Sequence, residues 1–280
     1  MKSTQIVTSI SQLRNVVSQW RRAGDRIGLV PTMGALHEGH LSLVRQTQKH
    51  CSRAIVSIFV NPAQFAPHED FDRYPRALQS DTEKLSELGL DLIFAPTVSE
   101  IYPTGFATSI EVGGPSAGLE SEFRPHFFAG VATVVAKLFI VVAPDYAIFG
   151  EKDYQQLLVV RRLTSDLGLP IEIAGGAIVR EPDGLAMSSR NAYLNPDERR
   201  IAAKLNVILK DAARSVRSSA TTTVESETEA ALLTAGFNSV DYVAVRDAAT
   251  LENIERLERP ARILAAVRVG GTRLIDNMAI

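Results

Sequence analysis

Apolar residues along the first 175 positions follow two alternating periods. Segment 11–23 places them at the i, i+3, i+4 and i+7 spacing of an amphipathic helix, whereas short continuous apolar runs such as 26–30 and 54–60 are typical of buried strands. Further helices are predicted over 39–51, 75–88, 131–142 and 154–167, and further strands over 91–94, 146–149 and 171–174. Because strand and helix alternate, the pattern predicts an α/β fold: a Rossmann-like, doubly wound, mostly parallel sheet with helices on both faces.

The pattern changes after residue 176. A long charged helix is predicted over 196–217, and the Ser/Thr-rich stretch 218–223 is typical of a surface loop. Two strands are then predicted, over 240–245 and 262–267. These features favour a smaller α+β unit, so we place a domain boundary between a Rossmann-like domain, residues 1–176, and a C-terminal α+β domain, residues 177–280.

Composition and charge narrow the range of partners. Of the 280 residues, 45% are hydrophobic, and 30 basic against 32 acidic side chains leave a net charge of −2. That balance gives no general attraction to nucleic acid or to an anionic membrane, so neither is expected as a partner. Cys51 is the single cysteine, which excludes an intrachain disulfide. The most apolar stretch, 130–143, is too short to span a bilayer, and the first residues lack a signal peptide's apolar core, so a cytoplasmic protein is predicted.

The first candidate site is the segment Pro-Thr-Met-Gly-Ala-Leu-His-Glu-Gly-His at 31–40. It follows a predicted strand and opens a predicted helix, so it lies at the carboxyl edge of the sheet, where exposed N–H groups and the helix dipole favour phosphate. His37 and His40 lie on one side of the first helical turn and could donate hydrogen bonds to phosphate oxygens. The alternatives are a helix cap or a metal pair, and the metal pair lacks a third ligand in register.

Two further segments carry polar groups at similar positions. In Asn-Pro-Ala-Gln-Phe at 61–65, Gln64 could offer an amide inside an apolar pocket, although turn chemistry beside a solvated acidic loop explains this segment equally simply. Segment 149–156 again follows a strand, and its Lys152 is a compact cation suited to phosphate, while Asp153 could cap the helix, hold Lys152 or hold a hydroxyl.

Two hydroxyls and an arginine follow a Gly-containing turn in a fourth segment, 183–191. Ser188, Ser189 and Arg190 could clamp a polyphosphate. A helix cap with a surface ion pair is the alternative, and the segment alone slightly favours the cap.

Together these segments resemble a known family. His-Glu-Gly-His at 37–40 and Met-Ser-Ser-Arg at 187–190 resemble the HIGH and KMSKS signatures of class I aminoacyl-tRNA synthetases and related nucleotidyltransferases. All four blocks are similar, in order and nearly letter for letter, to those of the pantothenate synthetases (pantoate–β-alanine ligases), and the resemblance runs from about residue 4 to the C-terminus. Neither a P-loop nor a G-x-G-x-x-G motif occurs, so P-loop kinases and ordinary dinucleotide-binding proteins lose their usual support.

The resemblance implies a two-step ligation that forms pantothenate, a coenzyme A precursor. ATP and D-pantoate first form pantoyl-adenylate and pyrophosphate, and β-alanine then attacks the activated carbonyl and releases AMP. Mg²⁺ would accompany ATP, held mainly by phosphate oxygens and water, with no protein ligand identified. Residues 1–176 would bind nucleotide and pantoate, residues 177–280 would form a lid, and the chain would be a homodimer.

The resemblance also assigns residues. His40 would be the catalytic proton donor, supported by His37 and Lys152. Gln64 would contact pantoate and β-alanine, and Gln156 pantoate. The residues implied in ATP binding are Met33, Gly34, Ala35, Leu36, His37, Glu38, Gly39, His40, Gly150, Glu151, Lys152, Asp153, Val179, Met187, Ser188, Ser189 and Arg190.

One segment departs from the family pattern R-P-G-H-F-x-G-V. In 124–131, His126 stands where glycine is usual and Phe127 where histidine is usual, and Ala66 also replaces a usual glycine. The change affects the expected pantoate contacts and leaves the adenylation residues intact. Two other functions are considered: a nucleotidyltransferase that stops at adenylyl transfer, which the two matched glutamines disfavour, and a regulatory nucleotide-binding module without catalysis, which the retained His, Lys, Ser and Arg residues disfavour.

Overall fold

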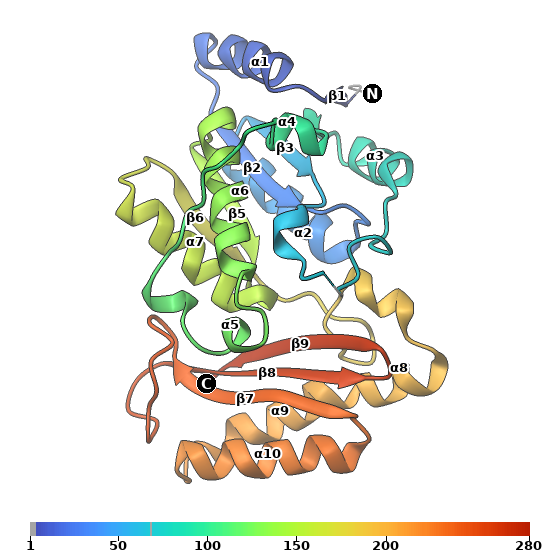
Figure 1. The fold of residues 1–280 in the computed structure, drawn as a ribbon, viewed down its shortest axis with the longest axis vertical. Coiled ribbons are helices and arrows are strands. Elements are labelled where there is room, and N and C mark those ends of the chain that lie inside the picture. Colours follow the sequence, from blue (N-terminus) through green and yellow to red (C-terminus); the bar gives the residue numbers. More distant parts are fainter. Residues whose placement is uncertain (1–3, 68) are drawn as a thin grey trace.

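The N-terminal part of the chain is built on a parallel sheet. The computed structural model describes residues 4–67 and 69–280 (Figure 1). The six strands are β1 (Gln5–Val7), β2 (Ile27–Thr32), β3 (Arg53–Ile58), β4 (Leu92–Phe94), β5 (Tyr146–Gly150) and β6 (Glu172–Gly176). Their order is β1-β4-β3-β2-β5-β6, and every neighbouring pair is parallel. The predicted doubly wound, mostly parallel sheet is therefore confirmed, with the short edge strand β1 as an addition.

Helices cover both faces of this sheet. They are α1 (Ile10–Arg22), α2 (Glu38–His50), α3 (Leu78–Glu87), α4 (Val98–Ile101), α5 (Glu120–Phe123), α6 (Phe127–Val142) and α7 (Tyr154–Asp166), with 3₁₀ turns η1 (Pro62–Gln64), η2 (Gly114–Ser116) and η3 (Glu151–Asp153). Leu29 of β2 packs into the core formed with α1, α6 and α7, whereas the next residue, Val30, packs into the core formed with α2 and α3. Burial of both strand faces explains why the strands are continuous apolar runs.

The C-terminal part forms a second unit with an antiparallel sheet. Its elements are η4 (Ser189–Tyr193), α8 (Pro196–Ala202), α9 (Lys204–Ser215), α10 (Thr221–Ala235), β7 (Ser239–Asp247), β8 (Ala261–Val269) and β9 (Thr272–Ala279). The sheet order is β7-β8-β9, and α9 and α10 lie on the side away from the parallel sheet (Figure 1). The unit has its own core around α9, α10 and β8. The small α+β unit is confirmed, and the boundary at 176/177 stays a prediction.

Three details differ from the sequence-based expectations. The helix expected over 196–217 is divided at Ala203 into α8 and α9. The surface loop expected over 218–223 is wrong for its second half, because α10 begins at Thr221, whose buried hydroxyl donates to the carbonyl of Ile254. The third strand, β9, was not predicted. Within the described residues, no helix combines the length and apolar character needed to cross a membrane.

Candidate active site

One large cavity lies between the carboxyl ends of β2, β3 and β5 and the inner face of the C-terminal sheet. Its volume is about 670 Å³. Val179 lines it, together with residues from all four sequence blocks: Met33, His37, Gly39, His40, Gln64, Gly150, Lys152, Asp153, Gln156, Met187, Ser188, Ser189 and Arg190. The convergence of the blocks at this edge follows from the fold, because each of the first three comes directly after a strand of the parallel sheet.

Five of the residues implied in ATP binding are not among those that line the cavity: Gly34, Ala35, Leu36, Glu38 and Glu151. Glu38 forms an ion pair with Arg45 further along α2, and Leu36 is buried in the core beside α2 and α3. Contact of ATP with these five residues therefore stays a prediction.

The loop before α2 is held by a carboxylate from α3. Gly34 and Ala35 have positive φ angles of 85° and 50°, a conformation that is unfavourable for alanine. The fully buried Asp81 accepts hydrogen bonds from the backbone N–H groups of Ala35 and Leu36, both at 2.8 Å. The expectation of exposed N–H groups is therefore wrong for these two, because both already donate to the carboxylate of Asp81. The sequence carried no signal for this role of Asp81.

The rings of His37 and His40 contact each other at the start of α2, with centroids 4.1 Å apart and planes tilted by 38°. The backbone N–H of His37 donates to Nδ1 of His40 at 3.4 Å, so the pair also caps the helix and the proton of neutral His40 lies on Nε2. Burial and then the charge of Lys152 lower the pKa of His37 to about 4. Burial, followed by the neighbouring His37 and Lys152, lowers the pKa of His40 to about 3. Both rings are therefore neutral at pH 7, and His40 can act as a neutral hydrogen-bond donor.

Lys152 enters the cavity from η3, directly after β5. Its side chain is 19% exposed, and its Nζ lies 3.9 Å from Oδ2 of Asp153. Asp153 makes no side-chain hydrogen bond to the start of α7, so the helix cap predicted for it is wrong, the ion pair with Lys152 is present, and a bond to a ligand hydroxyl stays a prediction. Among the described residues, Lys152 makes no closer ion pair, and its charge faces the cavity.

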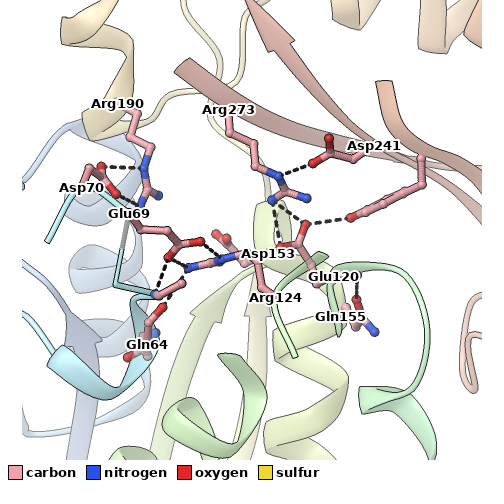
Figure 2. Close-up of polar contacts among 12 residues, drawn as sticks. Gln64, Glu69, Asp70, Glu120, Arg124, Asp153, Gln155, Arg190, Asp241 and Arg273 are labelled. Atoms are coloured by element: carbon pink, nitrogen blue, oxygen red, sulfur yellow. Dashed lines mark hydrogen bonds and ion pairs between the residues drawn. The ribbon is translucent and has the colours of Figure 1, made fainter. Parts of the chain in front are cut away.

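The last block reaches back to the parallel-sheet domain. Ser188 caps η4 by accepting from the backbone N–H of Arg190 at 3.3 Å, and the hydroxyl of Ser189 donates to the carbonyl of Ala35 at 3.1 Å. Arg190 donates to both carboxylate oxygens of Asp70, at 3.0 and 2.9 Å (Figure 2). Burial would raise the pKa of Asp70, but the hydrogen bonds and charge of Arg190 outweigh it and lower that pKa. Ser188 thus caps η4, and Arg190 in the same block places a cation at the cavity wall.

Gln64 is fixed by its neighbours on two sides. Asn61 donates from Nδ2 to Oε1 of Gln64 at 3.0 Å, and Arg124 donates to its backbone carbonyl at 2.8 Å. Arg124 also binds both oxygens of Glu69, at 2.6 and 2.8 Å (Figure 2). The acidic segment that the sequence suggested to be a solvated loop is therefore part of the cavity wall.

Three comparisons with known proteins agree. The profile of the family described as Pantoate-beta-alanine ligase matches residues 5–279. The pantothenate synthetases of Mesorhizobium japonicum and Caulobacter vibrioides are 55% and 53% identical to the chain; the matches cover 100% of this chain in both cases, and 99% and 100% of the relatives.

Solved structures give the same result. A pantothenate synthetase from Thermus thermophilus has a TM-score of 0.92 and 44% identity, covering 98% of this chain and 99% of that one. The pantoate-beta-alanine ligase of Francisella tularensis, in complex with beta-gamma ATP and beta-alanine, has a TM-score of 0.84 and 34% identity, covering 98% and 97%. The chain belongs to the pantoate–β-alanine ligase family. The ATP-dependent ligation predicted from the sequence is thereby confirmed as the activity of its family.

The departure from the family pattern has a structural counterpart in this member. The ring of Phe127 lies against the guanidinium of Arg124, whose central carbon is 3.9 Å from the ring centroid. Phe127 lines the cavity, whereas His126 is the residue before α6 and is not among the lining residues. At the position where the family pattern has histidine, this chain therefore has a phenylalanine whose ring packs on Arg124. His126 does not take the place of the missing histidine in the cavity wall.

Two parts of the cavity wall were missed by sequence reasoning. The apolar stripe Val131, Val134, Val135 and Leu138 of α6 lines the cavity, and the sequence marked this helix only as buried. The C-terminal sheet closes the opposite side, where Arg273 binds Glu120 at 2.8 Å (Figure 2). No local sequence signal marks either contact as part of a site.

Proposed function

We propose that this chain condenses D-pantoate with β-alanine, using ATP and releasing AMP and pyrophosphate through a pantoyl-adenylate. The observation that carries the proposal is the cavity at the carboxyl end of the parallel sheet, where the His37–His40 pair, Lys152, Arg190 and two glutamines come together. The cavity combines hydrogen-bond donors and cations for phosphates with an apolar wall, as a nucleotide and a branched acid together require.

In the first step, a carboxylate oxygen of pantoate attacks the α-phosphorus of ATP, and pyrophosphate leaves. Negative charge grows on the phosphate oxygens during this step. A neutral His40 that donates from Nε2 would stabilise that charge without having to be protonated, because its own Nδ1 already accepts from His37. Lys152 would add a positive charge beside it.

Arg190 would bind phosphate after leaving or sharing its pair with Asp70. This pair holds the guanidinium at the cavity wall, where a phosphate could replace one carboxylate oxygen. Residues 177–280 would act as a lid, supported by the hydrogen bond from Ser189 to the carbonyl of Ala35, which joins them to the parallel-sheet part of the chain beside the cavity. Exclusion of water would protect the acyl-adenylate from hydrolysis before the amine attacks.

Pantoate and β-alanine would lie between the two glutamines and α6. The amides of Gln64 and Gln156 would contact pantoate hydroxyl and carboxyl groups, and Gln64 would also contact β-alanine. The stripe that includes Val131 and Val135 offers a surface for the methyl groups of pantoate. In the second step, the β-alanine amine attacks the acyl carbon, the C–O bond to phosphate breaks, and AMP leaves.

Mg²⁺, a homodimer and a cytoplasmic location complete the proposal. Within the described residues, no group of three His, Cys, Asp or Glu side chains could hold a metal ion. Mg²⁺ would be bound through phosphate oxygens and water, where it would neutralise charge on the leaving pyrophosphate. The homodimer follows from the family resemblance, and the location from the single cysteine and from the most apolar stretch, 130–143, being too short to span a bilayer.

The test is substrate-dependent product release. Purified protein with ATP and D-pantoate should release pyrophosphate, and pantothenate and AMP should appear in solution once β-alanine is added. Acetate in place of pantoate is the matched control. Equal pyrophosphate release with acetate would contradict the assignment of pantoate.

A further inference from the structure

Asn277 lies at the seam between the C-terminal sheet and the turn that carries Lys152. The residue belongs to β9 and is 2% exposed. Its Nδ2 donates to the backbone carbonyls of Glu151 and Lys152, both at 2.9 Å. Both amide hydrogens are therefore used on two successive carbonyls of η3. Strand β9 of the antiparallel sheet therefore holds the main chain of η3, the turn that follows β5 of the parallel sheet.

The turn has little local support of its own. The residue before η3 is Gly150, which has no side chain to cap the turn, and Asp153, before α7, makes no side-chain capping hydrogen bond. A side chain added at Gly150 would meet no atom within 4 Å, and the main chain of Gly150 is held only on the β5 side, where it pairs with Gly176 of β6. The place of Lys152 consequently depends on contacts from outside the turn.

Arg262 keeps Asn277 in its orientation. Its guanidinium donates from Nη1 to Oδ1 of Asn277, and from Nη2 to Oε2 of Glu151 at 3.2 Å. The same guanidinium lies over the ring of Tyr154, 3.7 Å from the ring centroid. Because Arg262 occupies the amide oxygen, the amide nitrogen of Asn277 must face the two carbonyls of η3.

We propose that Asn277 is a positioning residue, which places Lys152 against His37 and His40 and so couples the C-terminal sheet to the adenylation step. The inference rests on the proposed function, in which Lys152 faces the phosphates. Asn277 lines the cavity, but Arg262 occupies its amide oxygen and the two carbonyls of η3 occupy its amide nitrogen, so in this assignment it acts through the main chain of η3.

The histidine pair offers a readout of where Lys152 lies. The charge of Lys152 is among the causes that lower the pKa of both rings. The charge of Lys84 also lowers the pKa of both rings, whereas the charge of Asp153 raises the pKa of His37. Of these groups, Lys152 and Asp153 lie on η3, whereas Lys84 lies on α3 and would not follow a movement of the turn.

The experiment compares Asn277→Ala with wild type and with Leu232→Ala. Leu232 is fully buried in the core around α10, so its truncation weakens the C-terminal unit without touching η3. The measurements are the imidazole titration of His37 by NMR and the KM for ATP and for pantoate. In Asn277→Ala we expect the pKa of His37 to rise and the KM for ATP to rise roughly three- to tenfold, the range for one or two lost hydrogen bonds. The KM for pantoate should change less, and Leu232→Ala should leave all three values near those of wild type.

Asn277→Ser is the second variant, for the case that Asn277→Ala does not fold. Serine is small enough for the space of Asn277 and keeps one hydrogen-bond donor. The pKa of His37 and the KM for ATP should therefore rise as in Asn277→Ala, but by less. The proposal would be overturned by a folded Asn277 variant in which the pKa of His37 and the KM for ATP are the same as in Leu232→Ala. The His37 titration does not depend on turnover. A wild type that releases no pyrophosphate would instead contradict the proposed function, so the two failures are distinguishable.

Discussion

The low pKa of His40 in the folded protein makes a prediction about stability in acid. A histidine with an ordinary pKa of 6.5 binds a proton in the unfolded chain as the pH falls, whereas the pKa of His40 in the folded protein is about 3. Between these two values the unfolded state binds more protons, so the free energy of unfolding must fall as the pH falls. In His40→Gln the side chain at this position does not titrate, so this contribution to the fall in the free energy of unfolding is absent.

The magnitude follows from the unfolded pKa. At about pH 5, protonation lowers the free energy of the unfolded chain by about 2 kcal/mol per histidine, since one pH unit corresponds to about 1.4 kcal/mol. Folded His40 is still neutral at that pH and gains nothing. At about pH 7.5 the same quantity is close to zero. The destabilisation caused by His40→Gln should therefore be about 2 kcal/mol smaller at about pH 5 than at about pH 7.5.

The assay is urea unfolding of wild type and His40→Gln at both pH values. Val44→Ala is the matched control, because Val44 is a fully buried residue of the same helix and its truncation removes packing without a titratable group. Its destabilisation should be the same at both pH values. If the effect of His40→Gln were equally independent of pH, the reasoning about the buried, neutral histidine would be refuted.

Three substitutions test other parts of the site. His40→Ala should slow adenylation roughly 10²-fold or more in single-turnover experiments and change KM much less, because its hydrogen bond strengthens in the transition state; an unchanged rate would exclude this role. In Gly130→Ala the new Cβ would lie 2.2 Å from the carbonyl oxygen of Ala63, so η1 must shift, and the KM for pantoate should rise more than that for ATP; equal changes would argue against a pantoate site at η1. Asp81→Asn replaces an oxygen acceptor by an N–H donor facing the 35–36 loop and should lower the free energy of unfolding by about 1–3 kcal/mol while raising the KM for ATP, measured by urea unfolding and steady-state kinetics.

The sequence predicted those features of the fold that depend on local periodicity. Alternating strand and helix segments place the loops at 31–40 and 149–156 at one edge of a parallel sheet, and the structure has them there. The helix boundaries were less accurate: α6 begins at Phe127, four residues before the expected start at 131. Local spacing does not report how far tertiary packing extends a helix.

The missed parts of the site are long-range pairs. Arg190 and Asp70 are 120 positions apart, and Asn277 and the carbonyl of Lys152 are 125 apart. Neither pair leaves a periodic signal, because the partners meet only when the C-terminal sheet lies over the parallel one. The role of Asp81 was missed for the same reason. A carboxylate in a charged helical segment is typical of an exposed position, but Asp81 is fully buried against the loop at 35–36.

The most direct test of the proposed chemistry follows an oxygen atom. Pantoate carrying a heavy oxygen isotope in its carboxylate is turned over with ATP and β-alanine, and the products are weighed by mass spectrometry. If the carboxylate attacks the α-phosphorus, the bond that β-alanine later breaks lies between that oxygen and the acyl carbon, so one labelled oxygen must appear in each AMP. AMP without the label, or label in inorganic phosphate beside ADP, would contradict adenylation of pantoate in this cavity.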